Sequence, residues 1–592
     1  MEYSKYQLDV FNFIKNEKGN CVISAVAGSG KTTTIVESLK IIPKTKSILF
    51  LAFNKAIVEE LKDRVPFNVK VRTFHSLGNS YILNTYPNMK MDGYKFYKYS
   101  EKLLEPYVKM NYPRKQHSAV LTEYRDLINV FRNNALYIPK ELTSSKIDDV
   151  LSNIYKIQSN NFDFEYIGSE DDYIRAIKML NEMNEDRERF DFNDMVYLPV
   201  INQDIKSNII SYDYVLVDEC QDLNITQQSF LDSIVKEKTG RFIAVGDERQ
   251  AIYGFAGADI HSFKNLTNKE NTITLPLSFC YRCGKNMIKY AQGFVKQIEA
   301  VETKGDGIIR DGKIEEVQTG DIVLSRVNKN LISLFFSLLK ENKKSFIKGK
   351  DIGENLIRMI TKSNAKNLKE FEKYVGEEVK KLRLKLETKI GRIIDEETFI
   401  NSSEYQHLIE KVDCIKTLNQ HYEKQLKTFQ DLKDKISLIF MDEGDGIMLS
   451  TVHKAKGLEN SRVFILDAFM FPATFAKEKW EKIQEQNLYY VAITRAKDEL
   501  VFIHENFERK IYRYLLLNDF DSIEKLVKKK KMDIDELYFM EDVSKYTFDF
   551  SMENKEKVYS YYSIPGYITF KELINKNKKI LNGRTTGANS TL

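Results

Sequence analysis

Short apolar runs rich in β-branched residues alternate along this chain with stretches that have the three- to four-residue apolar period of helices. The first set of runs comprises residues 21–23, 47–53, 214–217 and 241–245. Strands buried on both faces of a parallel sheet read as near-continuous hydrophobic runs, and the crossovers between them are usually helices. These runs therefore predict strands of one doubly wound parallel sheet.

A second set of runs begins near Leu277 and comprises residues 321–325, 447–451 and 463–467. The same argument predicts a second parallel sheet. The length of 592 residues agrees with this, because a single hydrophobic core stops growing at roughly 250 residues. The predicted fold class is therefore α/β with two parallel-sheet domains.

Mainly helical segments interrupt both sets. Residues 80–189, here called the first insertion, are polar and rich in Tyr, Asn and Lys, without a strand pattern of comparable strength. Residues 362–437, the second insertion, carry apolar residues at helical steps on both sides of a break that contains Gly391 and a cap signal at Ser402. This pattern predicts a helical hairpin, and we interpret its dense charge as a solvated face.

The amino-acid composition says more about the cellular compartment of the protein than about its function. The net charge is +5, from 90 basic and 85 acidic residues, so a nucleic-acid site must come from local clustering. Five cysteines, an odd and sparse set, indicate a reducing compartment. Cys280 and Cys283 form a CxxC pair without two further ligands at matching spacing, so we expect buried thiols rather than zinc. No apolar run approaches the roughly 18 residues that span a bilayer, and the first residues do not resemble a signal peptide. We expect no membrane partner and a cytoplasmic protein, with a nuclear location left open.

Residues 25–32, AVAGSGKT, directly follow the first predicted strand. Small residues let backbone N–H groups surround phosphates, Lys31 can reach the β- and γ-phosphate oxygens, and the Thr32 hydroxyl can hold Mg²⁺. Ala25 stands where the strict pattern has its first glycine. The segment predicts a phosphate-binding loop for a nucleoside triphosphate. Its candidate binding residues are Ala27, Gly28, Ser29, Gly30, Lys31, Thr32 and Thr33.

Two acids follow the buried run 214–217. A parallel sheet presents the carboxyl ends of its strands to the ligand, so Asp218 and Glu219 are expected beside the phosphate loop. Asp218 is a hard ligand suited to Mg²⁺, together with Thr32, and Glu219 can polarise the attacking water. By itself such a pair is also common as a helix cap, and the phosphate loop favours the catalytic interpretation.

Several blocks of the sequence occur in the order of known helicase motifs. They are Gln7, AVAGSGKT (25–32), LAFNKA (51–56), TFHSL (73–77), DECQD (218–222), VGDERQAIYGFAGAD (245–259), CYRC (280–283), STVHKAKGLE (450–459) and YYVAITRAK (489–497). On these blocks the chain resembles superfamily 1 helicases of the UvrD/Rep/PcrA type. The segments LAFNKAIVEEL and TFHSL are similar in sequence to those of the F-box DNA helicase branch, although we recognise no F-box ahead of them.

The resemblance implies two RecA-like P-loop NTPase cores, 1A and 2A, each with a mainly helical insertion. The implied division is core 1A in residues 1–79 and 190–276, insertion 1B in 80–189, core 2A in 277–361 and 438–515, a short 2B-like insertion in 362–437, and a C-terminal extension without an assigned role in 516–592.

The resemblance also implies roles around ATP. Gln7 would read the adenine edge, Tyr281 would stack on the base unless it is a core tyrosine, and Glu459 would contact the ribose or phosphate region. Gln250 would sense the γ-phosphate, and Arg282 and Arg495 would reach it from the second core, so that hydrolysis requires closure of the cores. The implied catalytic set is Lys31, Asp218, Glu219, Gln250, Arg282 and Arg495.

The implied DNA contacts combine aromatic and polar side chains, which hold single strands by stacking and by phosphate contacts. They are Phe53, Asn54, Phe74, His75, Tyr253, Phe255, Thr451 and His453. Phe255 stands where relatives often carry Trp, and Phe53 is shifted by one position and could be core. His75 alone would be read as an interior histidine. Residues 191–194 resemble a recurring family segment that we interpret as structural.

These roles predict an ATP-driven 3′ to 5′ translocase on single-stranded DNA that unwinds duplex at single-strand/duplex junctions or strips bound proteins, in repair, recombination or replication. An alternative is a motor subunit of a nuclease, recombination or defence complex, which contacts a protein partner through the insertions or the C-terminal extension and unwinds little alone. An RNA-directed helicase and a nucleotide-binding scaffold also stay open.

Overall fold

The computed structural model describes residues 3–62, 64–109, 114–158, 167–252, 261–390, 393–400, 402–473, 476, 479–505, 510–511, 513–514, 517, 519–530, 538–540 and 567–569. Two compact units divide the chain. The first contains residues 1–279 and 381–394, and the second contains residues 280–380 and 395–592. Each unit is described by itself.

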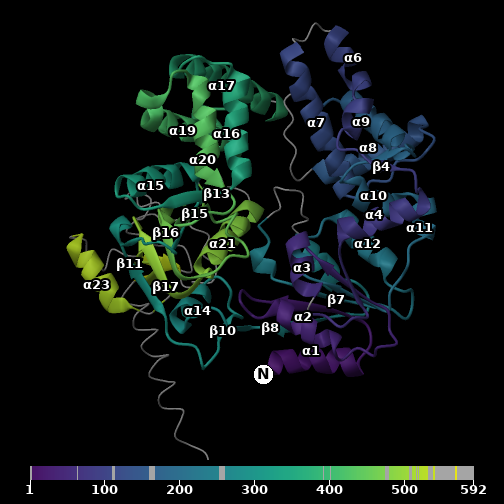
Figure 1. Ribbon diagram of the computed structural model, residues 1–592, viewed down its shortest axis with the longest axis horizontal. Coiled ribbons are helices and arrows are strands. Elements are labelled where there is room, and N and C mark those ends of the chain that lie inside the picture. The colour runs from purple at the N-terminus through teal and green to yellow at the C-terminus, as the bar shows by residue number, and fades with distance from the viewer. Residues whose placement is uncertain are drawn as a thin grey trace, which may run out of the picture. The chain divides into compact units, whose positions relative to one another are not determined.

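The first unit is built on a six-stranded sheet (Figure 1). Every neighbouring pair of strands is parallel. The strand order is β3 (Val69–Thr73), β2 (Ile48–Ala52), β6 (Tyr214–Val217), β7 (Arg241–Gly246), β1 (Asn20–Ala25) and β8 (Thr272–Leu277). The four apolar runs of the first set all lie in this sheet, so the prediction of one shared parallel sheet is confirmed.

Helices cover both faces of this sheet. Because successive side chains of a strand point to opposite faces, Val22 belongs to one core cluster and its neighbours Cys21 and Ile23 belong to another. The helices that pack with Cys21 and Ile23 are α1 (Lys5–Asn16), α2 (Lys31–Leu39) and α3 (Lys55–Lys62). Those in the cluster of Val22 include α4 (Phe74–Thr85), α10 (Asp194–Ile201), α12 (Ile225–Ile234) and α13 (Ser262–Thr267), with α11 (Gln203–Ser207) contributing Ile205.

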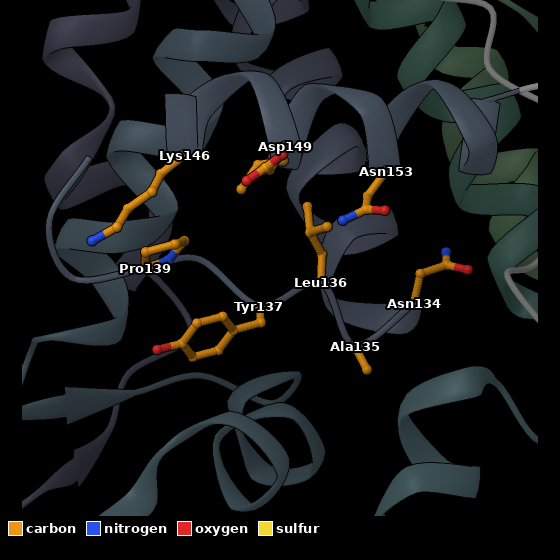
Figure 2. Close-up of a pocket in the computed structure, with 9 residues that line it drawn as sticks. Asn134, Ala135, Leu136, Tyr137, Pro139, Lys146, Asp149 and Asn153 are labelled. Carbon is orange, nitrogen blue, oxygen red and sulfur yellow. The ribbon is translucent and has the colours of Figure 1, made fainter. Parts of the chain in front are cut away.

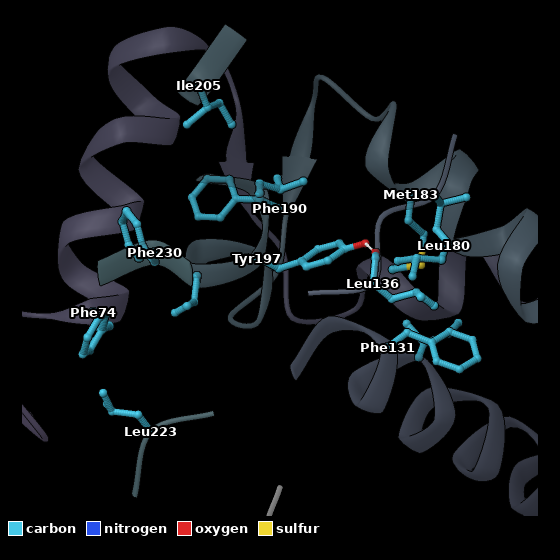
Figure 3. Packing of buried hydrophobic residues seen from close by; sticks show 14 of the residues in the cluster. Phe74, Phe131, Leu136, Leu180, Met183, Phe190, Tyr197, Ile205, Leu223 and Phe230 are labelled. Atoms are coloured by element: carbon cyan, nitrogen blue, oxygen red, sulfur yellow. Dashed lines mark hydrogen bonds between the residues drawn. The ribbon is translucent and has the colours of Figure 1, made fainter. Parts of the chain in front are cut away.

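The first insertion shares its hydrophobic core with the face of the sheet to which Val22 points. Its helices are α5 (Lys95–Tyr99), α6 (Glu101–Lys109), α7 (Arg114–Asn133), α8 (Ser144–Gln158) and α9 (Glu170–Asn184). Figure 3 shows Phe131 and Leu180 of the insertion in one cluster with Phe74 and Phe230, where the Tyr197 hydroxyl donates to the carbonyl of Leu136 at 2.6 Å. The insertion is therefore packed into the first domain rather than attached by a linker.

A pair of short strands ties the two ends of the insertion together. β4 (Lys90–Met91) and β5 (Arg189–Phe190) run parallel, with Met91 beside Phe190. These strands were not predicted, because two residues are too few to show a strand period.

The second unit contains a seven-stranded sheet, again with every neighbouring pair parallel. Its order is β11 (Ile308–Asp311), β17 (Ala496–Ile503), β16 (Asn460–Leu466), β12 (Ile322–Ser325), β15 (Ile447–Thr451), β13 (Ser345–Lys348) and β14 (Phe440–Met441). Helices α14 (Lys285–Ala291), α15 (Asn328–Lys340) and α21 (Lys479–Ile493) belong to this unit. Two parallel α/β domains are the RecA-like architecture that the resemblance implied.

The segment around the second insertion is helical: α16 (Lys350–Ser363), α17 (Leu368–Ile390), α18 (Glu396–Ile400), α19 (Ser403–Tyr422) and α20 (Leu432–Ile439). Ser402 caps α19, since its hydroxyl accepts the Tyr405 N–H at 3.3 Å. The helix α19 lies along α15, where Glu410 accepts the Asn328 N–H at 2.9 Å and the His421 ring stacks on Phe336. Ile415 and the strand residue Leu449 lie in one hydrophobic cluster, so this insertion also shares a core with its sheet.

The C-terminal extension contributes α23 (Phe520–Lys529) and the antiparallel pair β18 (Tyr538–Met540) and β19 (Tyr567–Thr569). A second small pair joins β9 (Phe279–Cys280) and β10 (Glu299–Ala300). The five cysteines are free and buried. Among the described residues, no helix combines the length and the hydropathy that a membrane crossing requires.

Candidate nucleotide and DNA sites

The phosphate loop lies between the carboxyl end of β1 and the first turn of α2. Gly28 and Gly30 have positive φ angles of 66° and 78°, a left-handed conformation that glycine adopts without steric strain. Ser29 between them is buried, and its hydroxyl has no hydrogen-bond partner among the described residues. A buried polar atom without a partner is costly in the free protein, and a bound phosphate oxygen would satisfy it.

Lys31 and Thr32, at the start of α2, meet the two acids at the end of β6. The Lys31 Nζ lies 3.1 Å from Glu219 Oε2, and the Thr32 hydroxyl lies 3.3 Å from Asp218 Oδ2. The strands β1 and β6 are separated in the sheet by β7, so only the tertiary fold brings these side chains together. Glu219 itself has a positive φ of 52°.

The charges of this cluster are out of balance. Burial lowers the pKa of Lys31, but the charges of Glu219, Asp247 and Asp218 outweigh it and the net shift is upward. Burial, aided by the Glu219 charge, raises the pKa of Asp218 to about 6. Burial also raises the pKa of Asp247 to about 6. Three carboxyl groups thus surround one ammonium group in a largely buried cluster.

This arrangement fits a divalent cation. Mg²⁺ prefers carboxylate and hydroxyl oxygens, and it is usually held by one or two protein groups together with water and substrate phosphates. Thr32 and Asp218 supply such a pair, and a cation there would relieve the excess negative charge. Within the described residues, no group of three or more His, Cys, Asp or Glu side chains is arranged as a metal cage.

A chain of hydrogen bonds leads from Glu219 to the loop after β7. The Gln221 amide donates to Glu219 Oε2 at 2.6 Å and accepts the Asp247 N–H at 3.1 Å. Gln250 in turn donates to Asp247 Oδ2 at 2.8 Å. The structure therefore brings Gln250 to the same cluster. Gln221 and Asp247 were not among the predicted site residues, although both lie inside the quoted motif blocks.

Gln7 lies on α1 and is largely buried. Its side chain accepts the Ser4 N–H at 3.0 Å and donates to the Thr34 hydroxyl at 3.2 Å. A side-chain amide has two donor hydrogens and two acceptor lone pairs, so these bonds fix its orientation and use half of its capacity. Gln7 is thus oriented from within its own helix cap and from α2.

Of the residues predicted to contact DNA, His75 has a partner that the sequence did not suggest. Its ring stacks on Phe192 with centroids 4.0 Å apart and planes 16° from parallel. Phe192 is 54% exposed, and Asp191 and Asp194 on either side of it are fixed by buried ion pairs. Residues 191–194 were interpreted as structural. That holds for the two acids, whereas Phe192 presents its ring to solvent.

Burial lowers the pKa of His75 to about 4, so the imidazole is neutral near pH 7. His75 can therefore stack or donate one hydrogen bond, but it does not supply a positive charge for phosphates.

The other predicted DNA contacts of the first unit differ in exposure. Phe53, after β2, is 46% exposed, and Asn54 caps α3 by accepting the Ile57 N–H at 3.0 Å. Phe74 is only 4% exposed and packs near Phe230, so it belongs to the core and is not positioned to stack on a base. Its place in the TFHSL block did not reveal which side of the helix it faces. Tyr253 and Phe255 lie outside the described residues.

In the second unit, Arg282, Glu459 and Arg495 form one cluster. Arg282 Nε donates to Glu459 Oε2 at 2.5 Å, and its Nη1 donates to the Thr494 carbonyl at 3.2 Å. Arg495 is buried and donates to the carbonyls of Val491 and Leu458 at 2.9 and 3.1 Å. Neighbouring Tyr281 is 42% exposed, which excludes the alternative of a core tyrosine.

Thr451 and His453 follow the carboxyl end of β15. Thr451 is buried, and burial lowers the pKa of His453 to about 3. The adjacent strand β12 ends beside Thr451 and is followed by Arg326, whose guanidinium pairs with Glu485 at 2.7 Å. Arg326 was not predicted, because a single arginine after a strand carries no pattern of its own.

A cavity lies elsewhere in the first unit. About 520 Å³ in volume, it is lined by Tyr137, Lys146, Asp149 and Asn153 among others, and Figure 2 shows these side chains around it. None of its lining residues belongs to the predicted sites.

The fold and the phosphate loop define a P-loop NTPase with two RecA-like domains. Residues 8–271 match the UvrD/REP helicase N-terminal domain, and residues 446–503 match the UvrD-like helicase C-terminal domain. The chain belongs to the UvrD/Rep helicase family, and the resemblance stated from the motifs is confirmed.

Three curated relatives illustrate the family. F-box DNA helicase protein 1 of Schizosaccharomyces pombe is 28% identical over 81% of this chain and 55% of its own length. ATP-dependent DNA helicase Rep of Buchnera aphidicola subsp. Baizongia pistaciae is 26% identical over 50% of this chain and 43% of its own length. A probable DNA helicase II homolog of Mycoplasma genitalium is 24% identical over 81% of this chain and 82% of its own length. The chain thus spans about half the length of the first two.

Proposed function

We propose that this protein is an ATP-dependent DNA helicase that translocates 3′ to 5′ on single-stranded DNA and acts at single-strand/duplex junctions. The observation that carries the proposal is the meeting of Lys31 and Thr32 with Glu219 and Asp218 at the phosphate loop. Membership of the UvrD/Rep family supports DNA as the substrate. The polarity and a role in repair, recombination or replication rest on the family resemblance alone.

The proposed subdomains follow the division expected from the sequence, with core 1A in residues 1–79 and 190–276 and core 2A in 277–361 and 438–515. The helices α5 to α9 then form insertion 1B, and α17 to α19 with most of α20 form the 2B-like insertion.

At the nucleotide, Lys31 would move from Glu219 to the β- and γ-phosphate oxygens. Glu219 would then keep its hydrogen bond from Gln221 and turn its carboxylate to the attacking water as general base. Thr32 and Asp218 would hold Mg²⁺, which neutralises charge on the phosphate oxygens as the leaving group departs. Gln250 would report the state of the γ-phosphate through Asp247 to the loop that follows it.

The remaining roles belong to the second core. Arg282 and Arg495 would stabilise charge that develops on the γ-phosphate, so that hydrolysis depends on closure of the two cores. Tyr281 and Gln7 would hold the base, and Glu459, which pairs with both Arg282 and Lys497, would orient the arginine cluster.

On the DNA side, Phe192 and His75 would form a stacking surface, with Phe53 and Asn54 after the neighbouring strand β2. Thr451 and His453 would contact the strand from the second core. The exposed face of Phe192 supports this assignment, because a solvent-facing aromatic ring held on a stacked partner is ready to receive a base. Tyr253 and Phe255 keep the role implied by their motif.

The test is ATP turnover with and without single-stranded DNA, followed by displacement of strands from duplexes with a 3′ or a 5′ overhang. We expect stimulation by DNA and displacement from the 3′ overhang alone. Lys31→Ala, which removes the only ammonium group described in the cluster of acids, should lose both activities. Turnover that ignores DNA would refute the proposal, and displacement from the 5′ overhang alone would refute the polarity.

A second candidate function is a partner-dependent motor, which hydrolyses ATP on single strands but unwinds little alone. The observation that favours it is the short second insertion, whose helices share one core with the sheet of core 2A instead of forming a separate core. Stimulated turnover without displacement from either overhang would support this function over the first.

A further inference from the structure

Two exposed tyrosines lie on the first insertion next to the segment that carries Phe192. Tyr94 and Tyr97 are 74% and 42% exposed, and their ring centroids are 6.3 Å apart. No role in the proposed mechanism uses them. Large aromatic rings that face solvent in pairs are uncommon on a surface that serves only solubility.

The backbone holds these tyrosines beside Phe192. The parallel strands β4 and β5 place Met91 opposite Phe190, and the Asp92 N–H donates to the Phe190 carbonyl at 2.8 Å. Tyr94 lies three residues beyond Met91, and Phe192 lies two residues beyond Phe190. Both aromatic residues therefore follow the carboxyl ends of the same pair of strands.

Buried charges fix this arrangement. Lys95, next to Tyr94, donates to Asp194 at 2.7 Å, and neither side chain of the pair is exposed. Arg132 of α7 pairs with Asp191 at 2.7 Å and with Asp194 at 3.0 Å. The segment of Tyr94 and the segment of Phe192 are thus tied to one charge network and cannot drift apart without exposing it.

The helix α7 contacts both the segment of the two tyrosines and the segment of Phe192. Arg125 Nη1 lies 3.5 Å from the Tyr97 hydroxyl, and Asn129, one turn further along, accepts from Asn193 at 2.7 Å. Arg132 then reaches Asp191 on the other side of Phe192. Four to seven residues of helix correspond to about 6–10 Å. These contact points on α7 are therefore as far apart along the helix as about two to three stacked nucleotides, at about 3.4 Å each.

We propose that Tyr94 and Tyr97 extend the stacking surface of His75 and Phe192, so that the first insertion binds further bases of the same DNA single strand. The inference rests on the proposed function. The chemistry favours a single strand because bases stack on such rings regardless of sequence, and a duplex offers no free base faces. We call Tyr94 and Tyr97 the insertion tyrosines.

Stacking, rather than charge, supplies the binding at this surface. Two nearby cations are paired locally, with Lys98 2.5 Å from Asp92 and Arg125 3.3 Å from Asp126. The salt dependence of DNA binding comes from contacts with phosphates, and stacking on bases does not contribute to it. Loss of the rings should therefore weaken binding by the same factor at every salt concentration.

The experiment measures binding of oligothymidylates of increasing length by the full chain, at several salt concentrations. The double variant Tyr94→Ala/Tyr97→Ala should bind long oligonucleotides about fivefold to a hundredfold more weakly than wild type, which corresponds to one stacked base or more. It should match wild type on the shortest oligonucleotides that bind, because these occupy the stacking surface of His75 and Phe192 first.

Two controls isolate the rings. Tyr94→Phe/Tyr97→Phe keeps both stacking faces and should bind like wild type at every length. Phe67→Ala removes another exposed ring, which is 93% exposed. Phe67 precedes β3 and His75 follows it, so the two residues lie at opposite ends of this strand. The Phe67→Ala variant should therefore also bind like wild type. Equal thermal unfolding midpoints of the variants would show that the fold is retained.

The binding results distinguish a failure of this inference from a failure of the proposed function. If wild type binds single strands and the double alanine variant matches it at every length, the insertion tyrosines are not a DNA surface, and the proposed function stands. If the variant loses affinity equally on the shortest strands, the surface is not an extension and the inference is wrong. If wild type itself binds no single-stranded DNA, the proposed function fails and the inference with it.

Discussion

Replacing Asp218 with asparagine should make the protein more stable and inactive at the same time. Asp218 is 4% exposed at the end of β6, and burial together with the Glu219 charge raises its pKa to about 6. The ionised carboxylate is thus held in a place that disfavours its charge. Asn has nearly the same shape and no charge, so Asp218→Asn removes this unfavourable contribution to folding.

The shift gives the size of the effect. The pKa rises from the ordinary 3.8 to about 6, so ionisation near neutral pH costs about 3 kcal/mol of stability, at about 1.4 kcal/mol per pKa unit. This net shift already includes the hydrogen bond that the carboxylate accepts from the Glu219 N–H. The free energy of unfolding of Asp218→Asn should therefore exceed that of wild type by up to about 3 kcal/mol.

The pH dependence follows from the same shift. Between the unfolded pKa near 3.8 and the folded pKa near 6, the native protein binds more protons than the unfolded chain at this carboxyl. Stability therefore rises as the pH falls through this window, and it is lowered above pH 6. The advantage of Asp218→Asn over wild type should be largest near pH 7 and vanish near pH 4.

The assay is thermal unfolding in buffer with a chelator and without nucleotide, at pH 7, 5.5 and 4. Asp213→Asn is the matched control, because Asp213 precedes the same strand β6. Burial raises the pKa of Asp213, but hydrogen bonds from Ser47 and Lys236 outweigh it and hold the pKa well below the usual value. Asp213→Asn should therefore be less stable than wild type. An Asp218→Asn protein that melts at or below the wild-type temperature at pH 7 would refute the reasoning.

Three further predictions concern the same chain. Glu219→Gln should lower DNA-stimulated ATP turnover at least about 10²-fold while leaving strand binding intact, because it removes the proposed general base; turnover near the wild-type rate would exclude that role. Lys95→Met should lower the free energy of unfolding by about 3 kcal/mol, because it leaves the fully buried Asp194 with one cation fewer, and an unchanged denaturation midpoint would contradict this. His75→Asn should weaken DNA binding by the same factor at pH 8 and at pH 6, because the pKa of about 4 keeps the imidazole neutral throughout; a factor that grows toward acid would show a charged histidine.

Much of the fold was predictable because the signals were local. The strand β6 has the predicted bounds of residues 214–217, and β15 has those of 447–451, since buried parallel strands are apolar at every position. The two short strands β4 and β5 escaped prediction because they lack enough residues for a period.

Residue types and spacing alone were enough to predict a phosphate loop and the side chains that would serve it. A phosphate loop is one continuous segment, and its glycines, Lys31 and Thr32 act where they stand in the sequence. Tertiary structure decided what depends on neighbours distant along the chain. Phe74 lies in the core although it is next to His75 in the sequence. Gln221 and Asp247 connect Glu219 to Gln250 through hydrogen bonds. The ring of Phe192 stacks on His75. The exposure of a side chain, the charges around it and the ring on which it stacks all depend on neighbouring residues. Those neighbours come together only when the chain packs into its tertiary structure.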